Sequence, residues 1–185
     1  MVGTRDAVTL GMTTPKRPLR EVLSTLSACK DSLAFAAPFG TDWSAALAEC
    51  PERAWLYWLA GRLMAHGHLD RKVLVMTACA CARTALRYVP SEEVRPLRAI
   101  EAAEAWCRGE TTIKDVRAAR MDAAAAAYAS ASADAAAAAY ASASADAARK
   151  QTDAELLTIV KRDLGPALLT GLTAYAATLP EAVAA

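Results

Sequence analysis

A twelve-residue segment that occurs twice in succession constrains the fold of this chain more than any other feature. It reads Asp-Ala-Ala-Ala-Ala-Ala-Tyr-Ala-Ser-Ala-Ser-Ala, first over 122–133 and again over 134–145, and a third copy begins at Asp146 and ends at Arg149–Lys150. Alanine is the best helix former, because its side chain loses no rotamer entropy and buries no polar group. Isolated helices become viable above roughly 12–15 residues, so the segment predicts a long helix.

The length of the repeat excludes a regular stripe of identical side chains along this helix. An α-helix turns by about 100° per residue, so each copy is rotated by roughly 120° relative to the one before it. Tyr128 and Tyr140 therefore lie on different faces. Coiled coils need a spacing of about 3.5 residues, and right-handed supercoils need a period of about 11. We interpret the helix as a slim structural strut, with a face that contacts a partner as the alternative.

Start and stop signals divide the rest of the chain into further helices. Residues 1–17 lack a helical period, contain Gly3, Gly11 and Pro15, and are predicted to form a flexible N-terminal arm. Proline at a first helical position, capping residues and glycine stops mark the boundaries that follow. The predicted helices span 18–29, 33–37, 42–50 with Thr41 as cap, 51–65, 71–89 with Asp70 as cap, 96–107, 112–149 and 167–179.

These helices predict an all-α fold, a multi-helix bundle with one long Ala-rich helix. A single domain is expected over 18–165, followed by a C-terminal helix and tail over 166–185. The long helix about 112–149 either stops near Lys150 or continues to 164, and Gly165–Pro166 is expected to end it. Residues 71–89 are apolar on nearly all sides, a pattern typical of a central, buried helix.

Composition excludes several classes of partner and location. The formal net charge is +1, which does not attract nucleic acid or an anionic membrane. No apolar run is long enough to cross a bilayer. The five cysteines are an odd number, and no secretory signal precedes them, so we expect free thiols and a cytoplasmic location.

Neither a catalytic site nor a metal site is predicted. His66 and His68 are the only histidines, and Cys79 and Cys81 follow them in the sequence. Residues two apart on a helix point roughly 200° away from each other, so the two cysteines cannot hold one ion together. The chain also lacks a Gly-rich phosphate loop and a Gly-x-Ser-x-Gly motif. We therefore expect a non-enzymatic protein without a cofactor or metal.

Four arginines near Pro90 are the candidate binding residues. Arg83 and Arg87 precede the turn, and Arg95 and Arg98 follow it, on helices that the short connection makes neighbours. They could hold an anion or an acidic loop of a partner through bidentate contacts. The alternative is an internal network in which nearby glutamates neutralise them, namely Glu92, Glu93, Glu101 and Glu104.

The residues that follow this turn resemble a known family. The segment 95–109 reads Arg-Pro-Leu-Arg-Ala-Ile-Glu-Ala-Ala-Glu-Ala-Trp-Cys-Arg-Gly and precedes an alanine-rich helix. It is similar to the motif of immunity-like proteins associated with bacterial polymorphic toxin systems, which also occur in actinobacterial and phage genomes. The tryptophan-rich segment 55–61 resembles the same proteins, and the similarity covers about residues 20–165. The resemblance implies a helical, non-enzymatic protein that works by binding.

The leading hypothesis is therefore a protein that binds and occludes a partner protein, either a toxin or a defence component. The candidate contact residues are Arg83, Arg87, Arg95, Arg98, Glu101 and Trp106. One alternative is a phage or host sponge that sequesters an anionic small molecule, such as a signalling nucleotide, at the arginines. Another is a structural module that forms a homo-oligomer through the alanine helix.

Overall fold

The computed structural model describes residues 17–134 and 142–180, with side chains over 17–125 and 152–180. Every regular element in this part of the chain is a helix, so the predicted all-α fold is confirmed. The predicted N-terminal arm, except for its last residue, and the end of the predicted C-terminal tail lie outside the described residues. Residues 135–141, which belong to the second alanine-rich copy and to the predicted helix over 112–149, also lie outside them.

The first half of the chain folds into short helices and one longer helix. They are α1 Leu19–Thr25, α2 Lys30–Ala36, the 3-10 turn η1 Ala37–Phe39, α3 Trp43–Glu49 and α4 Arg53–Ala65. Within the predicted helix 18–29, Leu19, Val22 and Leu23 are buried, but Cys29 is exposed and occupies the N-cap position of α2. The cap of α3 is Asp42 and not Thr41, because the Asp42 carboxylate accepts a hydrogen bond from the Ala45 amide at 3.0 Å.

The second half contains the longer helices. They are α5 Arg71–Ala85, the 3-10 turn η2 Leu86–Tyr88, α6 Arg95–Arg108, α7 Ile113–Asp134 and α8 Ser142–Thr178. Asp70 caps α5 as predicted, accepting a hydrogen bond from the Lys72 amide. Gly109 ends α6 with a φ of 82°, a left-handed conformation that glycine adopts without steric cost.

Helix α8 continues through Gly165–Pro166, so the predicted end of the helix at this pair is wrong. A proline inside a helix removes one backbone hydrogen bond and costs about 3 kcal/mol. Part of the usual clash involves the Cβ of the preceding residue, and Gly165 has none. The neighbouring Leu164 and Leu168 are completely buried, and each stabilises the fold by about 1.5–3 kcal/mol. Burial of α8 on both sides of the proline therefore outweighs the lost hydrogen bond.

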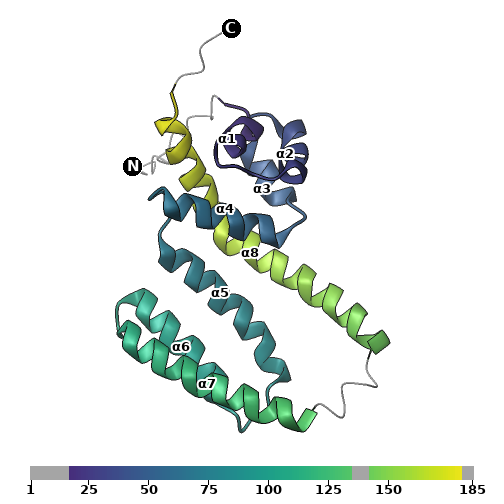
Figure 1. Cartoon of the computed structure of the whole chain (residues 1–185), viewed down its shortest axis with the longest axis vertical. Helices are drawn as coiled ribbons and strands as arrows, with labels where there is room; N and C mark the ends of the chain where they lie inside the picture. The colour runs from purple at the N-terminus through teal and green to yellow at the C-terminus, as the bar shows by residue number, and fades with distance from the viewer. Residues whose placement is uncertain (1–16, 135–141, 181–185) are drawn as a thin grey trace, which may run out of the picture.

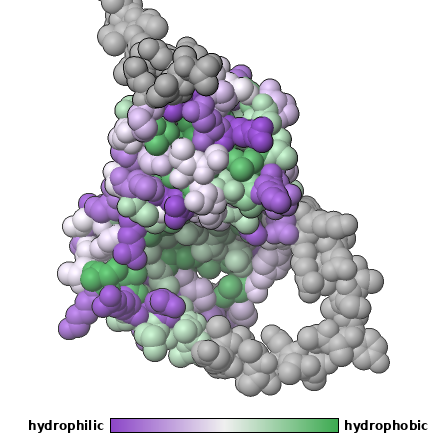
Figure 2. Space-filling view, turned by 45° about the horizontal axis from the view of Figure 1, so that its top comes forward, coloured by the Kyte–Doolittle hydropathy of each residue, from purple (hydrophilic) through white to green (hydrophobic). Residues whose placement is uncertain are grey.

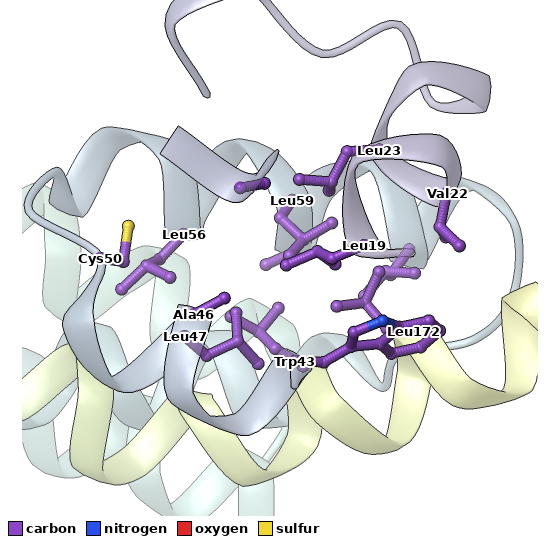
Figure 3. Close-up of a cluster of buried hydrophobic side chains, with 14 of the residues drawn as sticks. Leu19, Val22, Leu23, Trp43, Ala46, Leu47, Cys50, Leu56, Leu59 and Leu172 are labelled. Atoms are coloured by element: carbon purple, nitrogen blue, oxygen red, sulfur yellow. The ribbon is translucent and has the colours of Figure 1, made fainter. Parts of the chain in front are cut away.

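The hydrophobic core lies where α4 and α8 cross beneath the first three helices (Figure 1). Side chains of α1, α3 and α4 converge above α8 (Figure 3). Trp43 is the largest completely buried side chain, and its indole N–H donates to the Arg17 carbonyl at 3.1 Å. The α8 contribution comes from residues spaced four apart along one face, Val160, Leu164, Leu168 and Leu172.

Helix α5 is not the buried centre of the bundle, which corrects the prediction made for 71–89. Only Thr77 and Cys79 are buried in it, and Met76 is 41% exposed. It packs on α8 on one side and on α6 on the other, and part of its surface remains open. Although α5 is apolar on nearly all sides, it therefore connects α8 to α6 and leaves part of its apolar surface uncovered.

Helices α6 and α7 form a hairpin on the far side of α5 from the core (Figure 1). The capping pattern at its turn involves Thr112 and Asp115: the carboxylate accepts from the Thr112 amide at 3.1 Å, and the Asp115 amide donates to the Thr112 hydroxyl at 3.4 Å. Ile100 is the only buried residue of α6. In this outer part of the fold, most of the side chains described over 95–125 reach solvent.

Replacement of Gly171 by alanine is expected to destabilise the fold. A methyl group at this position would lie 2.6 Å from the carbonyl oxygen of His68 and 3.1 Å from Leu63 Cδ1. We expect Gly171→Ala to lower the free energy of unfolding by about 1–3 kcal/mol in urea denaturation. Gly61→Ala is the control, because a methyl group there meets no atom within 4 Å and should raise stability by about 0.5–1 kcal/mol. Equal effects of the two substitutions would contradict the proposed close contact.

Candidate interaction site

An open groove lies between α5, α6 and α8. Its volume is about 560 Å³. The residues that line it come from all three helices and are Lys72, Val73, Met76, Thr77, Ala80, Arg83, Glu104, Cys107, Arg108 and Asp163. The groove exists because α5 is covered only in part by its neighbours, as described above.

The floor of the groove is apolar. Val73, Met76 and Ala80 follow each other at steps of three and four residues, which places them on one face of α5. Thr77 between them is 1% exposed, and its hydroxyl donates to the Val73 carbonyl at 3.0 Å, so it adds no free polar group. The surface is hollowed between the upper and lower parts of the molecule, and hydrophobic side chains are visible inside the hollow (Figure 2). Methionine adapts its shape to what it contacts, so this floor suits an apolar side chain of a partner.

A bidentate ion pair between Arg83 and Glu104 ties α5 to α6 at the edge of the groove. Arg83 Nε and Nη2 each donate to a different oxygen of the Glu104 carboxylate, both at 2.8 Å. These hydrogen bonds lower the pKa of Glu104 and raise the pKa of Arg83. The pair holds the two helices at a fixed separation and keeps the carboxylate charged at neutral pH.

The four predicted arginines do not act as one cluster. Arg87 donates to both oxygens of Glu155 on α8, at 2.5 Å and 3.4 Å. Arg95 pairs with Glu93, and the hydrogen bonds from Arg95 lower the pKa of Glu93 to about 2. Arg98 is exposed, and the described part of the chain offers it no ion pair. Glu93 and Glu104 each neutralise an arginine, as expected for an internal network of ion pairs. The ion pair between Arg87 and Glu155 was not predicted from the sequence.

The other two predicted residues lie apart from the groove. Glu101 is exposed on α6. Its charge adds to the rise in the pKa of Arg83 that Glu104 mainly causes. Trp106 is partly buried, and the Lys72 ammonium lies 6.0 Å from the centre of its ring, within cation–π range. Of the six predicted residues only Arg83 lines the groove.

Lys72, Met76 and Cys107 also line the groove and were not predicted from the sequence. The spacing of Val73, Met76 and Ala80 was visible in the sequence, but an apolar helix gives no sign of which face its neighbours leave open. Only the packing of α8 and α6 on α5 decides that.

The chemistry of the groove offers no activated nucleophile. Burial raises the pKa of the Cys79 and Cys107 thiols, so the reactive thiolate form is disfavoured. All five cysteines are free. Among the described residues no group of three or more histidine, cysteine or acidic side chains is placed to hold a metal ion. Within the same residues no helix is long and apolar enough to cross a membrane.

The Arg83–Glu104 pair gives a testable dependence of stability on pH. Because the folded state lowers the Glu104 pKa, the stabilisation is complete above the ordinary carboxyl pKa of about 4.3 and is lost as the pH falls through the lower folded value. We expect Glu104→Gln to reduce the free energy of unfolding by at most about 1 kcal/mol at pH 7, since Arg83 is largely exposed. This difference from the wild type should shrink progressively as the pH falls below about 4.3.

Glu101→Gln is the matched control, because Glu101 lies on the same helix and makes no ion pair in the described residues. It should leave the urea denaturation curve unchanged at pH 7 and at pH 3. A Glu104→Gln effect that is the same at pH 3 and pH 7 would show that the charge of the pair is not responsible.

Part of the chain matches a known protein family. Residues 65–154 match the family described as Imm-5 like putative immunity protein. The matched segment spans α5, α6 and α7, with the end of α4 and the beginning of α8. No curated protein and no solved structure matches the chain. The resemblance seen in the 95–109 motif is thereby confirmed, and over residues 65–154 this chain is similar to the Imm-5 like immunity proteins.

Proposed function

We propose that this protein is a non-enzymatic immunity protein that binds a toxin and blocks its active surface. One observation carries the proposal: the segment that matches the immunity family contains α5–α7, the part of the fold that leaves an open apolar groove. A monomeric protein that exposes a groove of this kind presents a surface suited to another molecule.

The side chains around the groove favour binding over catalysis. Arg83 and Glu104 already satisfy each other, and the nearby thiols have raised pKa values. A partner side chain could enter over Met76 and Ala80, while the charged edge fixes its orientation. Interfaces of this type gain most of their affinity from a few apolar anchors surrounded by a polar rim. The free cysteines are compatible with the cytoplasmic location that we expect.

The two alternative functions receive less support. A sponge for an anionic molecule would need free guanidinium groups, but Arg83, Arg87 and Arg95 each hold a carboxylate. A ligand would have to displace these carboxylates. An oligomer formed through the alanine repeat would depend largely on side chains outside the described residues.

Coexpression in bacteria tests the proposed function. Toxin domains encoded beside the gene for this protein are expressed with and without it, and growth is measured. We expect restored growth with one toxin, and a complex of the two purified proteins in calorimetry. The proposal is wrong if no neighbouring toxin is neutralised and none binds the purified protein.

Replacement of Met76 by glutamate is expected to weaken this complex by at least about tenfold, because a charge would be buried against the apolar anchor. Ala48→Glu on α3 is the control, since Ala48 is exposed and lies outside the matched segment. Calorimetry should give the control the same Kd as the wild type, and circular dichroism should show both variants folded. Unchanged binding by Met76→Glu would place the interface elsewhere on the protein.

A further inference from the structure

Helix α7 separates its charges onto two sides. Lys114, Arg117 and Met121 follow each other at steps of three and four residues and therefore share one face, and Arg120 lies at the edge of that face, about 60° around the helix from Arg117. The two carboxylates in this part of α7, Asp115 and Asp122, lie about 80–160° around the helix from these four residues. We call the face formed by Lys114, Arg117, Arg120 and Met121 the α7 stripe.

The α7 stripe points to solvent. Val116, Ala119 and Ala123 are partly buried, and α7 packs mainly on α6, so these small residues form the side that faces the protein. Lys114, Arg117 and Arg120 are exposed, and Met121 is 68% exposed. Ile113, one residue before the stripe, is 42% exposed. Apolar and cationic groups are thus presented together on one exposed face.

The carboxylates of α7 do not neutralise the stripe. Asp115 is occupied by the helix cap, accepting from the Thr111 hydroxyl at 2.9 Å and the Thr112 hydroxyl at 2.6 Å. Asp122 lies near enough to Arg95 of α6 to add to the rise in the pKa of Arg95 that Glu93 mainly causes. Within the described side chains none of the three cations of the stripe makes an ion pair, unlike Arg83, Arg87 and Arg95.

We propose that the α7 stripe docks on an acidic surface of the partner protein, with Met121 as its apolar anchor. This inference rests on the proposed function and names the chemistry of the partner that the immunity protein recognises. Carboxylates of the partner would pair with Lys114 and Arg117 on either side of Met121. The stripe lies within the segment that matches the immunity family.

Charge argues against the other possible occupants of the stripe. A second copy related by a twofold axis would bring the same patch against itself, and three cations would then face three cations. Nucleic-acid binding depends mainly on the number of phosphates that cations neutralise, and this stripe supplies three cations in a chain with a net charge of +1. The exposed methionine also adds apolar surface that phosphate groups would leave uncovered.

A protein partner of opposite charge explains both parts of the stripe. Unpaired cations attract an acidic surface during diffusion and raise the association rate, an effect that salt weakens. Met121 then becomes buried and slows dissociation. The two contributions can be separated, because only the first depends on ionic strength.

The test uses the full chain and the toxin that it neutralises in coexpression. The variant is Lys114→Glu/Arg117→Glu, which reverses two charges of the stripe. Arg20→Glu/Lys30→Glu is the matched control, because it makes the same change in net charge at two exposed positions outside the matched segment. Association and dissociation rates are measured at 50 mM and 500 mM NaCl, with circular dichroism as the check of folding.

We expect the stripe variant to bind the toxin about 10–100-fold more weakly at 50 mM NaCl, mainly through slower association, with a smaller difference at 500 mM. The control should lose at most about threefold. Met121→Ser should raise the dissociation rate by a factor of about ten without changing the salt dependence. These results together would establish the acidic docking surface.

Three other results would overturn the inference. If the wild type neutralises a toxin and the stripe variant binds it equally well, the docking surface is wrong while the proposed function stands. If no toxin binds the wild type, the proposed function fails and the inference fails with it. Binding to a DNA duplex and to anionic vesicles is measured in parallel. If the wild type and the control bind one of these, and the stripe variant does not bind it but still binds the toxin, the stripe belongs to a different class of partner.

Discussion

The packing of α8 on α4 is the interaction on which the rest of this fold depends. Residues spaced four apart on α8, from Val160 to Leu172, are completely buried and connect α8 to the helices of the first half of the chain. At 37 residues, α8 is roughly 55 Å long, so it extends well beyond α4. The same helix therefore also packs on α5. Through α5, it supports the α6–α7 hairpin, which has little core of its own.

This arrangement explains why the interaction surfaces lie on the outer half of the molecule. The bulky side chains are concentrated between α1, α3, α4 and α8, while the partly buried side chains described in α7 are Val116 and three alanines, Ala119, Ala123 and Ala124. Small side chains allow close contact between helices but cover little apolar surface from solvent. The groove at Met76 and the exposed side chain of Met121 both result from this unequal distribution of volume. The stability of the protein and its proposed recognition of a partner therefore reside in different helices.

Sequence patterns predicted where the helices lie along the chain better than they predicted how each helix packs. Caps and stops such as Asp70 and Gly109 acted as expected, because their effect is local. Gly165–Pro166 did not, since the burial of Leu164 and Leu168 is a tertiary effect that outweighs a local signal. The apolar sequence of α5 could not reveal which of its faces stays open. For the same reason the partner of Arg87 was missed: Glu155 is 68 residues away, and only the fold brings it near.

The arginines show how electrostatics separates structural charges from charges available to a partner. Arg83, Arg87 and Arg95 surround one turn in the sequence, but each already pairs with a carboxylate. Arg83 and Arg87 pair with glutamates on other helices, and Arg95 pairs with Glu93, two residues away. The cations of α7 are less conspicuous in the sequence and have no such partner among the described side chains. An ion pair that is already formed gains little from a second anion, because the partner must first replace a satisfied contact. A cation without an ion-pair partner, beside an exposed methionine, has no such contact to lose when it binds an anion. Recognition by this protein is therefore better sought in α7 than in the arginines of the Pro90 turn.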